Sequence, residues 1–249
     1  VAILEVFGVA LVTAVATGIG AIPVGWLGPE RVARLQPMLL GVTAGVMTAA
    51  SVGLLIEPFN DGKYVPMVVG LALGAAFLLV AQRLVEKREG DGEHPFAKHQ
   101  QRSLLVFAVL FVHSLPEGFA LGSAWASSTA AIGVFVFIAI SLQNIPEGTA
   151  TAIPMAQAGY SRSRQFWAAV GTSLPQPVGA VIAFVLVEQI KALLPWSLGF
   201  AAGAMFALVV SDLLPEAVSE PADRKPAAIG TLGAIAGMTL LGLALSSWV

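Results

Sequence analysis

Two short motifs of related sequence lie in the middle of apolar segments and carry side chains that can bind a metal ion. The first, residues 113–118, reads HSLPEG, and the second, residues 143–148, reads QNIPEG. In each, a ligand-type side chain precedes a glutamate by four positions, so on a helix the two point the same way, one turn apart. A charged group at the centre of a bilayer costs roughly 2.5 to 3.5 kcal/mol on insertion scales and is functional by default. The motifs therefore predict a site inside the membrane.

The candidate ligands are His113 and Glu117 from the first motif and Gln143 and Glu147 from the second. Two ionised glutamates beside a neutral histidine would be neutralised by one divalent cation. The chain has no cysteine, so the donors are imidazole, carboxylate and amide, which suit zinc, iron, manganese, cobalt or cadmium better than magnesium or calcium. We expect a divalent transition metal as substrate and no organic cofactor.

Simpler interpretations exist for each residue taken alone. A single histidine in a helix is usually a structural residue, and a single transmembrane glutamate can be a helix–helix hydrogen-bond partner or a proton relay. Two copies of the motif at matching depth favour a cation site.

Composition places the motifs in an all-α polytopic membrane protein with one domain, residues 1–249. Hydrophobic residues make up 57% of the chain and charged residues 11%, which does not suit a soluble domain of this size. The sequence has no basic face or RNA-type aromatic motif, so nucleic acid is not an expected partner. The chain begins at Val1 without a charged n-region or a cleavage pattern, so we read its first apolar segment as a retained span.

Eight apolar stretches are long enough to cross the roughly 30 Å of bilayer hydrocarbon. They run approximately over residues 2–27, 37–58, 66–85, 104–125, 130–155, 166–188, 198–214 and 227–249. Residues 86–101 form the one long connection and contain His94 and His99, for which solvation is a simpler reading than metal sensing. Small residues at helical spacing predict close helix packing in spans three and eight, at Gly70, Gly74, Gly230, Gly233 and Gly237.

The basic residues indicate how the spans are oriented. Of the 13 Lys and Arg, only Lys63 and Lys191 fall outside one set of alternate connections and their edges. The others are Arg31, Arg34, Arg83, Lys87, Arg88, Lys98, Arg102, Arg162, Arg164, Arg224 and Lys225. This positive-inside bias makes residues 86–101 cytoplasmic and puts both termini outside the cytoplasm of a multi-pass protein of the inner (plasma) membrane.

Other polar residues could line the route of a cation. Gln176 in span six lies near the midplane and could reach the site, whereas Asp212 and Glu216 lie toward the cytoplasmic end of span seven, where they could line an exit. A solvated helix end explains Glu216 equally well. Met47, at mid-depth in span two, could be a thioether ligand, although core packing is the simpler reading of a methionine.

Four acidic residues fall near the predicted outer face: Glu5, Glu57, Asp61 and Glu188. They could gather cations at an entrance, and ordinary solvation at the interface explains them nearly as well.

The chain resembles the ZIP family of divalent metal transporters, in particular its GufA-like branch. The resemblance rests on the paired Pro-Glu-Gly segments, the Ala-Gly-Val-Met segment of span two, the Leu-Pro-Glu end of span seven and the eight-span layout, and it covers nearly the whole chain. It implies that the first and last three spans form an inverted repeat around spans four and five. It also implies a binuclear metal site on those two spans and movement of metal into the cytoplasm, and it makes a homodimer plausible.

Carried over by this resemblance, the first metal position falls on His113, Glu117, Gln143 and Glu147, with Met47 as a further ligand. The second position differs from the pattern of the branch. Ser114 and Asn144 stand where Asn and Asp are often found, and Gln176 stands where a Glu is usual. With only two glutamates to share, a second divalent ion would leave positive charge uncompensated in a low-dielectric site. We therefore expect one tightly held ion, with these three residues as polar lining.

Two other classes of function compete with metal transport. An intramembrane zinc-dependent hydrolase could use His113, Glu117 and Glu147 as ligands, but the chain lacks a His-Glu-x-x-His motif. A proton-coupled carrier of organic solutes could use the glutamates as relays and would not need the histidine. Transport of divalent transition metals, with zinc preferred, explains more of the motif than either.

Overall fold

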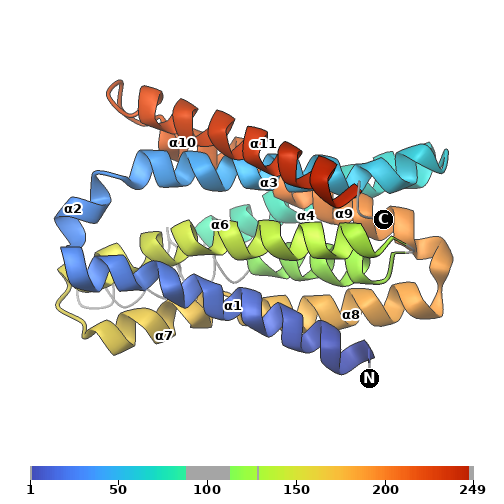
Figure 1. Ribbon diagram of the computed structural model, residues 1–249, viewed down its shortest axis with the longest axis horizontal. Coiled ribbons are helices and arrows are strands. Elements are labelled where there is room, and N and C mark those ends of the chain that lie inside the picture. The colour runs from blue at the N-terminus through green and yellow to red at the C-terminus, as the bar shows by residue number, and fades with distance from the viewer. Residues whose placement is uncertain (1, 88–112, 128, 247–249) are drawn as a thin grey trace.

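The computed structural model describes residues 2–87, 113–127 and 129–246, and all the regular secondary structure in these ranges is helical (Figure 1). Seven helical segments of the described ranges are long and apolar enough to cross a membrane. The predicted all-α polytopic class is therefore confirmed. The predicted span at 104–125 begins outside the described residues and is helical over 113–125. Most of the predicted cytoplasmic connection, including His94 and His99, also lies outside them.

The helix boundaries follow the apolar stretches closely. The short helix Pro29–Ala33, which begins at a proline after the positive-φ residue Gly28, was not predicted. The elements are α1 (Ala2–Leu27), α2 (Pro29–Ala33), α3 (Gln36–Asn60), α4 (Tyr64–Lys87), the helix over 113–125, α6 (Ala130–Gln157), α7 (Arg162–Thr172), α8 (Pro175–Gln189), η1 (Lys191–Leu193), α9 (Leu194–Leu208), η2 (Val209–Leu213), α10 (Leu214–Ala217) and α11 (Arg224–Ser246).

Two of the predicted spans are interrupted helices. Span six consists of α7 and α8, which are separated at Ser173 and Leu174, and Pro175 opens α8 at a position where its missing N–H leaves no hydrogen bond unmade. Span seven consists of α9 and α10, joined by the π-helical turn η2 that contains Asp212. Such turns inside α-helices are frequent at functional sites. By contrast, α6 continues through its own proline, Pro146.

Glycines let the backbones of the site helices touch. A Cβ added to Gly148 on α6 would lie 1.7 Å from the carbonyl oxygen of Thr17 on α1, and one added to Gly118 would lie 2.3 Å from that of Gln176 on α8. Both approaches are closer than any side chain permits. The two Pro-Glu-Gly motifs are therefore held directly against α1 and α8.

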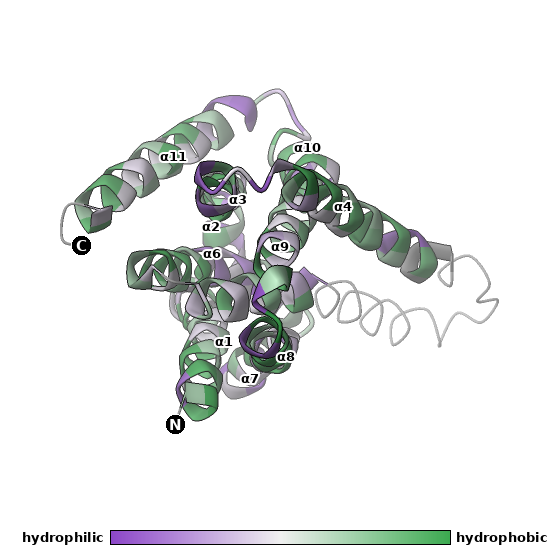
Figure 2. Cartoon of the chain, turned by 90° about the vertical axis from the view of Figure 1, so that its right-hand side faces the viewer, coloured by the Kyte–Doolittle hydropathy of each residue, from purple (hydrophilic) through white to green (hydrophobic). Residues whose placement is uncertain are grey.

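The predicted glycine packing is correct for three positions and wrong for two. Gly70 and Gly74 pack against the α9 backbone and Gly230 against that of α3, but a Cβ at Gly233 or Gly237 would meet nothing within 4 Å. The reason is the position of α11, which runs along the periphery and buries only a small share of its residues (Figure 2). On this peripheral helix Gly233 and Gly237 are exposed, whereas a Cβ at Gly242 would lie 3.6 Å from Phe135 of α6.

Candidate metal centre

The two glutamates of the motifs come together in the interior. Glu117, from the helix over 113–125, is 1% exposed, and Glu147 on α6 is half-buried. Their carboxyl groups lie within hydrogen-bonding reach of each other. Within the described part of the chain, no Lys, Arg or His forms an ion pair with either one. A buried and a half-buried carboxylate placed together without a basic partner form a site that attracts a cation.

Gln143 lies beside this pair with one end of its carboxamide satisfied and the other free. Its Nε2 donates a 2.6 Å hydrogen bond to Glu117 Oε1, while its Oε1 is buried and has no hydrogen-bond partner among the described residues. A buried carbonyl oxygen left without a partner costs about 1–3 kcal/mol. A cation held by the glutamates would give this oxygen a partner.

Gln176 and Asn144 form a closed network on the other side of Glu117. Gln176 Nε2 donates to Glu117 Oε2 at 2.5 Å and to Asn144 Oδ1 at 3.2 Å. Asn144 Nδ2 donates to Gln176 Oε1 at 3.1 Å and to the carbonyl of Thr13 at 2.7 Å. The Thr13 hydroxyl donates to Gln176 Oε1 at 2.8 Å. Each amide group is therefore satisfied by protein atoms alone.

The hydroxyl of Ser114 donates to the carbonyl of Thr172 at 3.0 Å, so it too is used within the protein. The neighbouring hydroxyls of Thr17 and Ser173 lie 2.7 Å apart. Thr13 and Thr17 were missed by the sequence reasoning. The signal for them was present, since two threonines four residues apart in a strongly apolar segment share one helix face.

His113 contacts a different group of residues from the glutamates. Its Nε2 lies 3.1 Å from Nε2 of Gln82 on α4 and 3.5 Å from Oδ2 of Asp212 in η2. Gln82 is buried and also donates to Asp212 Oδ2 at 2.7 Å. Gln82 was not predicted as a site residue. A lone glutamine near the end of an apolar span gives little signal, because its partners are far away in the sequence.

The remaining predicted residues are more dispersed. Met47 is fully buried in the apolar core on α3. Glu216 is exposed on α10 and accepts a 3.3 Å hydrogen bond from Gln36. Among the described residues, no point is approached by three or more His, Asp or Glu side chains. The candidate centre therefore combines two carboxylates with the amide oxygen of Gln143, with His113 held to one side.

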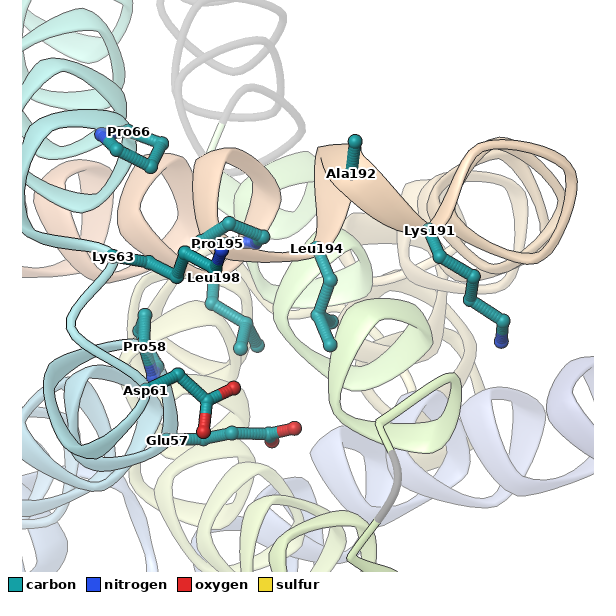
Figure 3. A pocket seen from close by; sticks show the side chains of 10 residues that line it. All are labelled: Glu57, Pro58, Asp61, Lys63, Pro66, Lys191, Ala192, Leu194, Pro195 and Leu198. Carbon is teal, nitrogen blue, oxygen red and sulfur yellow. The ribbon is translucent and has the colours of Figure 1, made fainter.

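The predicted outer end of the bundle contains a cavity of about 310 Å³ (Figure 3). Glu57 and Asp61 from the end of α3 line it together with Lys63 and Lys191. Glu57 accepts a hydrogen bond from Ser127, and Lys191 pairs with Glu188. Of the four acidic residues expected at an entrance, Glu57 and Asp61 line this cavity, Glu188 only pairs with its Lys191, and Glu5 is exposed in the first turn of α1.

Comparison with known proteins identifies related sequences over most of the chain. The profile of the family described as "ZIP Zinc transporter" matches residues 83–245. Zinc transporter GufA of Myxococcus xanthus is 32% identical over 219 residues, covering 83% of this chain and 85% of that protein. Zinc transporter ZIPB of Bordetella bronchiseptica is 32% identical, covering 92% and 78%. A putative zinc transporter of Arabidopsis thaliana is 33% identical over 96% of this chain, which spans only 38% of that longer protein.

Proposed function

This chain belongs to the ZIP family of zinc transporters, and from that premise we propose that it carries divalent transition-metal cations, zinc above all, into the cytoplasm through the Glu117–Glu147 site. Metal cation transport, and not catalysis, is the activity that its relatives' names carry. A zinc-dependent hydrolase is therefore not favoured. The observation that carries the proposal is the pair of glutamates, Glu117 buried and Glu147 half-buried, without a basic partner in the described residues and next to the unsatisfied oxygen of Gln143.

The hydrogen bonds around Glu117 support a single tightly held ion. In the described part of the chain, Gln143 Oε1 is the site oxygen left without a donor, whereas Asn144 and Gln176 satisfy each other and Thr13. A second ion near these amides would have to break that network and would bring no compensating carboxylate. Ser114, Asn144 and Gln176 are accordingly polar lining, and an ion stays there only in passing.

His113 and Met47 complete the proposed ligand set. His113 precedes Glu117 by one helical turn, so a rotation of its side chain away from Gln82 and Asp212 directs the imidazole toward the glutamates. Met47 enters from the family resemblance, with its side chain fully buried on α3. Asp212 and Glu216 then mark the way out.

The contacts of the glycines support an inverted repeat. Gly20 of α1 approaches the carbonyl of Ile145, and Gly179 of α8 approaches that of Leu115; each carbonyl belongs to the residue before the motif proline. In the same way, the contact of Gly148 with Thr17 matches the contact of Gly118 with Gln176. Both matches are explained if a two-fold axis relates the pair α1 and α6 to the pair formed by α8 and the helix over 113–125.

The outer helices repeat the pattern. Gly41 of α3 approaches Ala227 of α11, as Gly199 of α9 approaches Met67 of α4. Gly230 of α11 approaches Met38, as Gly70 of α4 approaches Trp196. The repeat therefore relates α3 to α9 and α11 to α4, so that the first three spans match the last three in order and surround the two motif helices.

We infer the direction of transport and the location of the protein from the sequence. The positive-inside distribution of Lys and Arg supports a plasma-membrane protein with both termini outside the cytoplasm. The cavity lined by Glu57, Asp61, Lys63 and Lys191 then faces outward as an entrance, and Glu216 faces the cytoplasm. A homodimer is the proposed assembly, on the strength of the family alone.

Metal uptake into proteoliposomes that contain the purified full-length chain tests the proposal. Glu117→Ala and Glu147→Ala should each abolish zinc uptake, because the remaining ligands cannot neutralise a divalent ion. Glu5→Ala is the matched control, since it removes an exposed carboxylate from α1, and it should transport normally. Competition by cadmium, manganese, cobalt and iron ranks the preferred metals. Undiminished zinc flux in both site variants would refute the Glu117–Glu147 site.

A further inference from the structure

We propose that His113 and Asp212 form a second, transient cation position on the route, and that the carboxamide of Gln82 fills this position whenever the cation is absent. The inference rests on the proposed function, because it concerns where the ion goes after it leaves the glutamates. It adds Gln82, a residue outside the motifs, as the group that an ion must displace.

The distances among the three side chains carry the argument. Gln82 Nε2 lies between two acceptors, 2.7 Å from Asp212 Oδ2 and 3.1 Å from His113 Nε2. Those two atoms are 3.5 Å apart. Two ligand atoms on one tetrahedral zinc, each about 2.1 Å from it, are separated by roughly 3.4 Å. The histidine and the aspartate are thus already spaced as two ligands of one ion, with an N–H group pointing into the place of that ion.

The hydrogen bonds fix which end of Gln82 faces the pair. Its Nε2 donates to the Asp212 carboxylate, and its Oε1 lies 3.5 Å from the hydroxyl of Ser211, which can donate to it. The His113 Nε2 lone pair consequently accepts from the amide. This lone pair is the one that would bind a metal, so an amide and a cation compete for it.

The position combines a protected side and an open side. Gln82 is 7% exposed and His113 is 9% exposed, while the side chain of Asp212 is 35% exposed. Asp212 belongs to the π-helical turn η2, which interrupts α9 at this point. An ion held here would be shielded toward the glutamates and accessible at the aspartate, as a site of passage requires.

The other half of the repeat lacks an equivalent. The matched glycines Gly41 and Gly199, Gly70 and Gly230, and Gly118 and Gly148 set the register between the two halves of the repeat. In this register Asp212 corresponds to Leu54, Gln82 to Gly242 and His113 to Gln143. Leu54 is fully buried and apolar. The two halves of the repeat therefore differ, because the ionisable pair His113 and Asp212 lies on only one side of the glutamates. The route of the ion has this polar position only on the side of α4 and α9.

The displaced amide explains how the ion is released. Entry of the cation breaks the hydrogen bonds from Gln82 to Asp212 and His113, and these bonds form again when the ion leaves. The amide therefore weakens binding and prevents the ion from being trapped between an imidazole and a carboxylate. A conducting path needs positions of this kind, favourable enough to enter and weak enough to leave.

Zinc binding to the purified full-length chain in detergent tests this inference. The background is Glu117→Ala/Glu147→Ala, which removes the first site and leaves His113, Asp212 and Gln82 in place. Adding Gln82→Leu, which conserves volume and removes the N–H, should tighten zinc binding about tenfold, because hydrogen bonds to a charged group no longer compete with the ion. Adding Asp212→Asn to that triple variant should abolish the gain.

Gln165→Leu is the matched control, since Gln165 is a buried glutamine on α7 whose amide, among the described residues, bonds to a backbone carbonyl alone. Gln82→Ala repeats the test if the leucine variant does not elute as a single species. Unchanged zinc affinity after loss of the Gln82 amide in folded protein would overturn the proposal, as would a gain that persists with Asp212→Asn. These zinc affinities are measured without transport. Failure of the proposed function is recognised by a different result, which is zinc uptake that persists in Glu117→Ala and Glu147→Ala.

Discussion

Gln143 donates its amide hydrogen to Glu117 at 2.6 Å while its own carbonyl oxygen remains buried without a partner among the described residues. The amide thereby orients one of the two carboxylates, and its unpaired oxygen lies beside that contact. In a membrane interior such an oxygen is expensive to leave unsatisfied. The arrangement is explained if a cation occupies the space beside this oxygen during the transport cycle.

Replacement of Gln143 by leucine should weaken zinc binding by about 10- to 100-fold, since both a candidate ligand and the group that orients Glu117 are lost. Calorimetric titration of the purified variant measures the affinity. Gln165→Leu removes a buried glutamine away from the site and should bind zinc as the unmodified protein does. Equal affinities for the two variants would mean that Gln143 has no part in the site.

Introducing carboxylates next to the site should change the number of bound ions. In the double variant Asn144→Asp/Gln176→Glu, the two new carboxylates and those of Glu117 and Glu147 make four at the site. Four carboxylates are enough to neutralise two divalent cations. The bound cadmium per chain after dialysis, measured by elemental analysis, should rise from one ion to two. If the unmodified protein already holds two ions at full occupancy, the single-ion proposal is wrong.

Zinc should protect the folded protein against heat through Glu117 and Glu147. A ligand present at 100 times its dissociation constant stabilises the state that binds it by about 2.7 kcal/mol. The unfolding temperature in detergent should therefore rise with zinc and fall back on chelation, whereas Glu117→Ala/Glu147→Ala should respond far less. An equal rise in the double variant would indicate that zinc stabilises the fold from another place.

The glycine contacts predict where a single methyl group is not tolerated. Gly148→Ala would place a Cβ 1.7 Å from the Thr17 carbonyl, so α1 and α6 must separate, and we expect a loss of at least about 1–3 kcal/mol in stability. Gly237→Ala on α11 meets nothing within 4 Å and should leave stability unchanged or slightly raised. Thermal unfolding monitored by size-exclusion chromatography separates the two variants. Similar behaviour would contradict the close approach of α1 and α6.

The helices of this protein were predictable because their signal is local. An apolar stretch of about 20 residues has to be helical in a bilayer, where each backbone group must find its partner within the segment. The predicted bounds of spans one, two and five lie within a few residues of α1, α3 and α6. The pairing of Glu117 with Glu147 was also accessible, because two similar motifs at equal depth on consecutive spans converge when those spans pack together.

Sequence by itself thus determined the class of the protein, the approximate bounds of most of its long helices and the two carboxylates at its centre. Only the tertiary structure decided what surrounds them: that Thr13 of α1 completes the network of Asn144 and Gln176, and that Gln82 lies between His113 and Asp212. It also decided that Gly230 packs while Gly237 faces outward. The physical reason is range. Helix formation in lipid depends on neighbours along the chain, whereas these contacts join residues far apart in sequence, and their geometry follows from how whole helices pack.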